Sequence, residues 1–293
     1  MTNGASGPVE SVARVLSTAP PTGGAAGPMV LIHPGALPAS HYDAMTAALP
    51  DRAVVLVDLE RVPAYVQGAL NGGLPRITLD ELLTLVRSSI LSTLDDVGAS
   101  ADRWMLAGWS FGGVLAHCLV GRLEPTQRPT SLLLIDSIAP VPRFLDRTDS
   151  IAADLVLGWF AMYLAAKRGV PLPVPNGAAD LDAILQAGLA SGTLRPGTTL
   201  PGLAKLFQAY TDGLRRNNRL VRDHHPEPVT VPVTLLRPDR GLLADPGALG
   251  WESLANDLRI VPCPGDHYTV LRDRTAIAEL RRIADAHAAS VAA

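Results

Sequence analysis

The stretch Trp104-Met105-Leu106-Ala107-Gly108-Trp109-Ser110-Phe111-Gly112-Gly113 decides the fold of this chain. An apolar run leads into Gly-x-Ser-x-Gly, and a helix-forming run, Gly112 to Leu123, follows it. This pattern predicts a tight strand-to-helix turn whose serine side chain stands above the end of a sheet. Glycines two residues before and after the serine are needed because strand and helix approach too closely there for a β-carbon. The flanking runs favour this interpretation over a glycine-rich turn with an incidental serine, so Ser110 is predicted to be a nucleophile.

Short apolar runs alternate with helical patterns along the rest of the chain. The predicted strands are Met29–His33, Ala53–Asp58, Trp104–Ala107, Ser131–Asp136, Val231–Arg237 and Leu258–Pro262. The predicted helices are Leu79–Leu94, Gly112–Leu123 and Arg274–Ala288. Strands that are apolar on both faces and separated by helices are typical of a mostly parallel sheet covered by helices on both sides. The sequence therefore predicts an α/β fold.

Residues 137–228 interrupt this alternation, because about 90 residues pass without a convincing strand. Three helices are predicted there, at Asp149–Lys167, Asp180–Ala190 and Leu203–Arg219. A helical insertion between core strands usually covers the carboxyl edge of the sheet, where ligands bind. The first of these helices is apolar around most of its circumference, so it either packs in the core or lines an apolar chamber. Trp159 and Tyr163 on this helix are candidate substrate contacts.

Composition excludes several classes of protein. The chain has 293 residues, 47% of them hydrophobic and 18% charged, which is enough to bury a core and excludes intrinsic disorder. A net charge of −3 indicates neither a nucleic-acid nor a membrane-surface partner. Two cysteines, Cys118 and Cys263, cannot form a disulfide framework or a four-ligand zinc site. Residues 1–28 carry no targeting signal and are expected to form a flexible arm or linker of a cytoplasmic protein.

A serine hydroxyl needs a general base within hydrogen-bonding distance to act as a nucleophile at neutral pH. The chain has seven histidines. Four of them lie in helices or in a polar connector away from the serine: His117, His224, His225 and His287. His267 instead lies in Pro264-Gly265-Asp266-His267-Tyr268, after the last predicted strand, and this loop opens at the sheet edge that carries Ser110. We predict that His267 is the base.

A third group should orient the imidazole of the base and stabilise its charged form. Asp136 ends the strand that follows the helix after Ser110. Asp239 follows the next strand, which is the commoner place for the acid. Asp266 is adjacent to His267, and neighbouring side chains in a loop generally diverge. Spacing alone leaves Asp136 and Asp239 as equal candidates.

The chain resembles the thioesterase domains that release products from polyketide synthases and nonribosomal peptide synthetases. The likeness extends from about Met29 to the C-terminus. Four segments carry it: Leu31-Ile32-His33-Pro34-Gly35-Ala36 with Tyr42 soon after, Gly108 to Gly113, Leu133-Leu134-Ile135-Asp136-Ser137, and Pro264 to Tyr268. The resemblance implies an α/β-hydrolase fold over 29–293 with a helical lid at about 137–228. Family members place the acid after the first strand that follows the nucleophile turn, so the resemblance also favours Asp136.

Further site residues follow from the same resemblance. The backbone N–H groups of Ala36 and Phe111 are expected to form the oxyanion hole. Family members often have Pro-x-Gly-Gly in the first loop, whereas this chain has Pro34-Gly35-Ala36-Leu37, so Leu37 is a candidate substrate contact that alters the width of the cleft. Trp109 and Tyr268 are candidate substrate contacts as well, with packing beside the catalytic residues as the alternative.

The resemblance implies a serine hydrolase that takes an acyl chain from the phosphopantetheine thioester of an acyl or peptidyl carrier protein. The acyl-serine would be released by water or by macrocyclisation, as in antibiotic biosynthesis, without a metal or redox cofactor. Three alternatives are a stand-alone type II editing thioesterase, a generic carboxylesterase or lipase, and a non-catalytic binding protein with a hydrolase fold. Polyketide-type relatives pair through helices before the core, and Val9–Leu16 is the segment that could serve a homodimer in this way.

Overall fold

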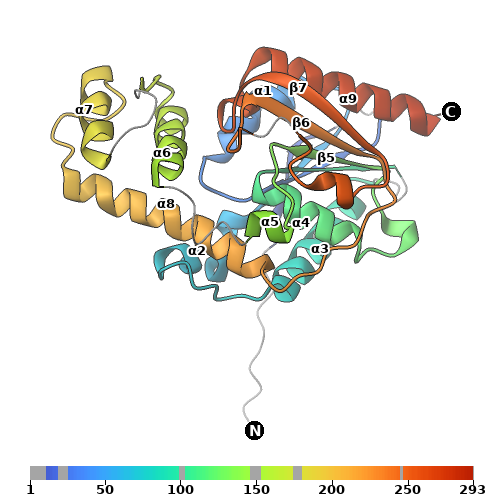
Figure 1. The fold of residues 1–293 in the computed structure, drawn as a ribbon. Coiled ribbons are helices and arrows are strands. Elements are labelled where there is room, and N and C mark those ends of the chain that lie inside the picture. Colours follow the sequence, from blue (N-terminus) through green and yellow to red (C-terminus); the bar gives the residue numbers. More distant parts are fainter. Residues whose placement is uncertain are drawn as a thin grey trace, which may run out of the picture.

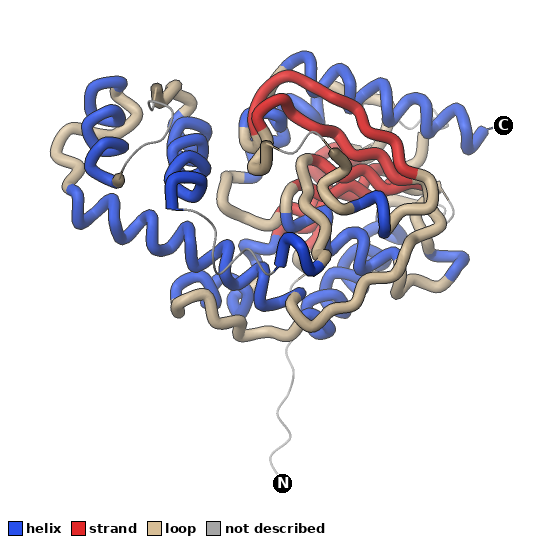
Figure 2. Tube along the Cα trace, in the orientation of Figure 1, coloured by secondary structure: helices blue, strands red, loops and turns tan. Residues whose placement is uncertain are grey.

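A seven-stranded sheet with the order β1-β3-β2-β4-β5-β6-β7 forms the centre of the molecule (Figures 1 and 2). The structure is a computed structural model that describes residues 11–18, 26–98, 103–145, 153–173, 180–244 and 247–292. The strands are β1 (Ala13–Ser17), β2 (Met29–His33), β3 (Val54–Asp58), β4 (Met105–Trp109), β5 (Ser131–Ile135), β6 (Val233–Arg240) and β7 (Leu258–Asp266). All neighbouring pairs are parallel except β1 and β3.

The central strands are buried on both faces. Every residue of β2, β3 and β4 is buried, as expected for parallel strands whose sequences are almost continuously apolar. The predicted α/β fold is therefore confirmed. The last two strands continue beyond their predicted ends, to Arg240 and Asp266, and so bring polar residues to the carboxyl edge of the sheet.

Two helical layers cover the sheet (Figure 1). Helices α3 (Leu79–Asp96) and α4 (Phe111–Val120) pack on one face, and α1 (Asp43–Ala47) and α9 (Arg274–Ala292) pack on the other. A capping box starts α3, because Thr78 accepts from the Glu81 N–H and the Glu81 carboxylate accepts from the Thr78 N–H. Single-turn 3₁₀ helices span Ala39–Tyr42, Leu59–Arg61, Pro125–Gln127, Trp251–Ser253 and Thr269–Leu271.

Between β5 and β6 the chain leaves the sheet and forms the helical insertion. Its helices are α5 (Pro142–Leu145), α6 (Ala153–Arg168), α7 (Leu181–Ser191) and α8 (Leu200–Val221). In Figure 1, α6 and α7 stand beside the sheet, and α8 leads back from them and packs along α2 (Pro63–Leu70). The last three correspond to the helices predicted for this segment, although the predicted start of the first, 149–152, lies outside the described residues. Within the described ranges, no helix is long and apolar enough to cross a membrane.

The N-terminal segment differs from its prediction as an arm over residues 1–28. Ala13–Ser17 form the edge strand β1, which pairs antiparallel with β3 in a register that sets Ala13 opposite Val57. The described part of Val9–Leu16 is therefore extended chain ending in a strand, and the helix that we proposed for a homodimer is absent from it. The remaining parts of the predicted arm, 1–10 and 19–25, lie outside the described residues.

The glycines on either side of Ser110, Gly108 and Gly112, are expected to be sensitive to substitution. A β-carbon on Gly112 would lie 2.2 Å from the Ile32 carbonyl oxygen, so β2 and α4 would have to separate. We expect Gly112→Ala to lower the free energy of unfolding by about 3 kcal/mol. Gly158 in α6 has no atom within 4 Å of such a β-carbon, and Gly158→Ala should stabilise by about 0.5–1 kcal/mol. Urea denaturation tests both, and wild-type stability of Gly112→Ala would contradict the close approach.

Candidate active site

Ser110 lies at the turn between β4 and α4 in a strained backbone conformation. Its φ of 54° and ψ of −126° fall outside the regions that non-glycine residues favour. The turn is possible because the flanking residues lack side chains: a β-carbon on Gly108 would lie 2.3 Å from the Gly112 carbonyl oxygen. The Ser110 N–H is satisfied by the Ile135 carbonyl at 2.9 Å. The hydroxyl therefore projects at the carboxyl edge of the sheet, as the motif predicts.

His267 and Asp136 complete a hydrogen-bonded chain with Ser110. The Ser110 hydroxyl lies 3.1 Å from His267 Nε2, and His267 Nδ1 lies 2.7 Å from Asp136 Oδ2. The imidazole is therefore oriented with Nδ1–H donating to the carboxylate and Nε2 free to accept from the serine. His267 and Asp136 are almost fully buried, at 2% exposure each.

The two other acid candidates occupy different places. Asp239 is exposed on β6, and within the described parts of the chain it forms no hydrogen bond or ion pair with His267. Asp266 forms the turn that presents the histidine, because its Oδ1 accepts from the Tyr268 and Thr269 N–H groups at 3.0 and 2.9 Å. Geometry thus separates Asp136 and Asp239, which spacing left equal.

The surroundings of Asp136 include a buried cation that the sequence did not reveal. Arg237 Nε is 3.9 Å from Asp136 Oδ1, and both side chains are buried. The same guanidinium donates to the Leu243 carbonyl at 3.0 Å, which fixes its position. A β-carbon on Gly241 would lie 2.7 Å from Asp136 Oδ1. The carboxylate therefore interacts with His267 and Arg237, and the backbone at Gly241 approaches it closely.

Ala36 and Phe111, the expected oxyanion donors, both border the space beside Ser110. Phe111 is the first residue of α4, so its N–H belongs to the unpaired end of that helix. Ala36 follows β2 with a φ of 76°. Glu60, a residue that our sequence reasoning did not single out, borders the same cleft as Ala36.

Trp109 and Tyr268, predicted as substrate contacts, border the cleft but contact His267 directly. Trp109 Nε1 donates to the His267 carbonyl at 2.8 Å, and its ring lies 5.2 Å from the imidazole. Tyr268 packs edge-on against the imidazole at 4.8 Å. Its hydroxyl is hydrogen-bonded to that of Tyr210 in α8 at 2.9 Å, which joins the insertion to the histidine loop. These contacts agree with the packing alternative and leave a cleft-facing role open.

The remaining predicted contacts separate into two groups. Tyr163 borders the cleft, with its hydroxyl accepting from Lys167 Nζ at 2.7 Å. Trp159 borders a second, apolar pocket, and its Nε1 donates to the Leu242 carbonyl at 2.7 Å. Leu37 was predicted to be a substrate contact, and the structure contradicts this. Its side chain is fully buried in the core and lines neither cavity, because its loop turns back onto β2, where the Leu37 carbonyl contacts His33.

Two cavities meet at Ser110. The cleft has a volume of about 440 Å³ and combines aromatic and polar groups from the first loop, α2, α6 and α8. The apolar pocket has a volume of about 140 Å³ and lies on the Phe111 side. Its walls are mainly aliphatic and aromatic, with Val114, Ile138, Phe144, Leu214 and Leu243 among them. Ser110, Leu214, Asn217 and Leu242 border both, so the serine lies where the two spaces join.

The cysteines do not offer a competing nucleophile. Cys118 and Cys263 are both buried, and burial raises the pKa of each thiol to about 12. The thiolate, which is the reactive form, is therefore scarce at neutral pH.

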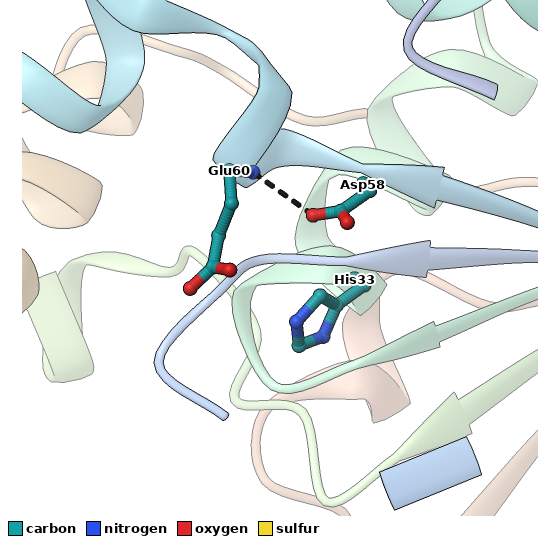
Figure 3. Close-up of side chains that lie close together, drawn as sticks. All are labelled: His33, Asp58 and Glu60. Atoms are coloured by element: carbon teal, nitrogen blue, oxygen red, sulfur yellow. Dashed lines mark hydrogen bonds between the residues drawn. The ribbon is translucent and has the colours of Figure 1, made fainter. Parts of the chain in front are cut away.

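One group of possible metal ligands lies near the site among the described residues. The ligand atoms of His33, Asp58 and Glu60 all lie within 4.8 Å of one another (Figure 3). Both ring nitrogens of His33 already have partners, since Nε2 lies 2.8 Å from the Leu37 carbonyl and Nδ1 lies 2.9 Å from the Tyr42 hydroxyl. Nε2 must therefore carry the proton and Nδ1 accept one, which leaves no nitrogen lone pair for a metal. His33 and Tyr42, the histidine and tyrosine of the segment that begins at Leu31, are therefore hydrogen-bonded to each other.

Comparisons with known proteins place this geometry in a recognised fold. No protein-family model and no curated protein matches the sequence. Among solved structures, the RedJ thioesterase from the prodiginine pathway of Streptomyces coelicolor is 18% identical, with a TM-score of 0.54 over 89% of this chain and 85% of that one. A covalent complex of the NocB thioesterase domain with a fluorophosphonate nocardicin G analogue is 23% identical, with a TM-score of 0.55 over 88% and 94%.

A longer protein is similar as well. A four-domain nonribosomal peptide synthetase bound to AMP and glycine is 23% identical, with a TM-score of 0.61 over 94% of this chain. The chain spans only 20% of that protein's length. At these identities the likeness establishes the fold: the chain shares the α/β-hydrolase fold of the thioesterase domains found in these biosynthetic pathways.

Proposed function

We propose that this chain is a serine thioesterase that takes an acyl or peptidyl chain from the phosphopantetheine thioester of a carrier protein. The observation that carries the proposal is the buried chain from Asp136 through His267 to Ser110, on a fold shared with thioesterase domains. The distances of 2.7 and 3.1 Å are those of a nucleophile, its base and the group that orients the base.

In the first step, Ser110 Oγ attacks the thioester carbonyl while its proton passes to His267 Nε2. The carbonyl oxygen becomes an oxyanion, which the N–H groups of Phe111 and Ala36 would stabilise. Asp136 stabilises the imidazolium and keeps Nε2 directed at the serine. Collapse of the intermediate breaks the carbon–sulfur bond, and His267 returns the proton to the leaving thiolate. The products are an acyl-Ser110 ester and a free pantetheine thiol.

In the second step, water or a hydroxyl or amine of the acyl chain attacks the acyl-serine. His267 takes the proton of the attacking group and then gives it to Ser110 Oγ, which leaves as a hydroxyl. Attack by water releases an acid, whereas internal attack releases a ring. Because the cleft lies between the insertion and the sheet, closure there would exclude water and favour the ring.

The two cavities fit a thioester, which extends on both sides of its carbonyl. One side carries the acyl chain and the other carries the pantetheine arm. Ser110 lies where the cleft and the apolar pocket join, so the proposal places one arm of the substrate in each. A hydrolase acting on a small ester would need only one of these spaces.

Mass spectrometry of the intact protein tests the proposal. The protein is mixed with a panel of acyl-pantetheine thioesters and, for comparison, with the matching oxygen esters. We expect an acyl adduct on Ser110 that is absent from Ser110→Ala, with faster acylation by thioesters. Released acid, or a product lighter by one water, then reports hydrolysis or cyclisation. Absence of both adduct and turnover across the thioesters would contradict the proposal, and preference for oxygen esters would indicate a carboxylesterase.

A further inference from the structure

Asn217 on α8 is a polar residue of the site that neither the sequence motifs nor the catalytic contacts explain. It borders both the cleft and the apolar pocket, as Ser110 does. Helix α8 packs along α2 (Figure 1), and this packing brings Asn217 to Tyr65 and the loop that follows β2. The side chain is half-buried, so part of it is open to the space beside the serine.

The contacts of Asn217 determine which way its carboxamide points. Arg216 Nε and Nη2 both donate to Asn217 Oδ1, at 3.1 and 2.8 Å. A guanidinium has donors only, so the atom that receives these two bonds must be the oxygen. The Tyr65 hydroxyl lies 2.9 Å from the same oxygen. The nitrogen, Nδ2, is therefore the other branch, and within the described parts of the chain it has no hydrogen-bond partner.

Arg216 holds this arrangement in place. Its side chain is buried, with Cζ 3.4 Å from the centre of the Tyr65 ring and Nη1 donating to the Tyr65 carbonyl at 3.0 Å. A β-carbon on Gly68 of α2 would lie 2.9 Å from Arg216 Cδ, so the arginine packs tightly against that helix. The Tyr65 hydroxyl also lies 3.0 Å from the Pro34 carbonyl. The Asn217 donor is therefore preorganised relative to the loop that carries Ala36.

A fixed N–H donor beside the nucleophile fits a substrate that has a second carbonyl near the thioester. An unpaired donor in a partly enclosed space gains from an acceptor on the ligand, and a ligand without one leaves the donor unsatisfied. A carrier-bound substrate offers amide carbonyls on both sides of the thioester. One set belongs to the pantetheine arm, and a peptidyl chain supplies the other.

We propose that Asn217 Nδ2 selects the substrate by donating a hydrogen bond to an amide carbonyl that lies next to the thioester attacked by Ser110. This inference rests on the proposed function. It narrows the substrate from acyl thioesters in general to those that carry an amide close to the reacting carbonyl. Asn217 determines specificity in this way and takes no part in proton transfer.

Asn217→Asp separates the donor from the rest of the residue. The aspartate keeps an oxygen that accepts from Arg216 and replaces the amide N–H₂ with a second acceptor. Asn217→Ala removes the donor and the acceptor together. Asn256→Asp makes the same change at an exposed residue before the amino end of β7, which is the sheet edge opposite Ser110. It serves as the matched control.

The test compares four thioesters, with an N-acetylglycyl or a pentanoyl group on either pantetheine or hexanethiol. These acyl groups have the same chain length and differ in the amide. The amide preference is kcat/KM with the amide divided by kcat/KM without it. We expect this preference to fall about tenfold in Asn217→Asp and Asn217→Ala and to stay unchanged in Asn256→Asp. Loss on the acyl side places the recognised carbonyl in the acyl chain, and loss on the thiol side places it in the pantetheine arm.

A ratio of rates distinguishes recognition from a structural role. Displacement of the loop that carries Ala36, or a new charge near the oxyanion, slows all four thioesters alike and cancels in the preference. Equal losses on all four would overturn the proposal and leave Asn217 as a structural partner of Arg216 and Tyr65. Melting temperatures accompany the rates, and if Asn217→Ala is unstable, Asn217→Asp decides.

Fluorophosphonates keep this inference separate from the proposed function. Ser110 Oγ bonds to phosphorus, fluoride leaves and the serine proton passes to His267. Probes with an amide in the alkyl chain are compared with plain alkyl probes. If no thioester acylates Ser110 but Asn217→Asp loses a preference for the amide probes, the thioesterase proposal fails and selection by Asn217 stands. If thioesters react and the variant keeps the wild-type preference, the reverse holds. No amide preference in either assay would overturn the inference.

Discussion

Ser110→Ala and His267→Ala are each expected to lower kcat for thioester turnover by about a million-fold, and combining them should cost little more. Either change removes a partner of the 3.1 Å hydrogen bond between Ser110 Oγ and His267 Nε2. Nucleophile and base act as one unit, so the second loss has nothing further to remove. The residual rate would reflect binding and the oxyanion donors alone.

Single-turnover kinetics with a saturating acyl-pantetheine thioester measure these losses without interference from product release. Ser88→Ala removes an exposed serine of α3 and should turn over like wild type. Multiplicative losses in the double variant would show that Ser110 and His267 act independently. That result would contradict a shared mechanism.

Asp136→Asn should lower kcat by about 10⁴, whereas Asp239→Asn should leave it unchanged. The Asp136 carboxylate accepts from His267 Nδ1 at 2.7 Å, and an asparagine amide placed there can donate instead, which favours the wrong tautomer of the imidazole. Asp239 is exposed and makes no such contact in the described structure.

The same thioester assay ranks the two aspartate variants, and the ranking decides the acid. If Asp239→Asn caused the larger loss, the acid would come from β6 and the observed Asp136 contact would be structural. Melting temperatures are needed beside the rates, because Asp136 also lies 3.9 Å from the buried Arg237 guanidinium. An Asp136→Asn protein that is folded and inactive supports the assignment.

Motif and chain order were sufficient to predict that Ser110 and His267 lie together at one edge of the sheet. The Gly-x-Ser-x-Gly turn is local, and the histidine loop follows a strand whose apolar pattern is clear, so both positions depend on short-range signals. The choice between Asp136 and Asp239 is not local, because both follow parallel strands that end at the same edge. Only the path of each loop after its strand determines which carboxylate reaches the imidazole.

The errors arose where contacts between distant segments decide the structure. Ala13–Ser17 form a strand because the edge of β3, more than 35 residues away in sequence, offers hydrogen-bonding partners. The sequence of this segment, which is rich in small residues, does not predict that pairing. Leu37 was assigned from the sequence of its loop, but that loop turns the side chain into the core. Glu60 lies in no motif, and its place in the cleft wall beside Gly35 depends on how two strand-end loops lie side by side.

Backbone strain is concentrated in the site. Of the four described non-glycine residues with positive φ, three are Ala36, Ser110 and Asp136. Each costs about 1–2 kcal/mol that a glycine would recover. The proposed mechanism needs only the N–H of residue 36, so a glycine there would relax the chain and keep the donor. The same mechanism needs the side chains at 110 and 136, so selection for it would retain the strained residues there. Those two positions therefore lower the stability of the folded protein, and favourable packing elsewhere in the core has to offset that loss.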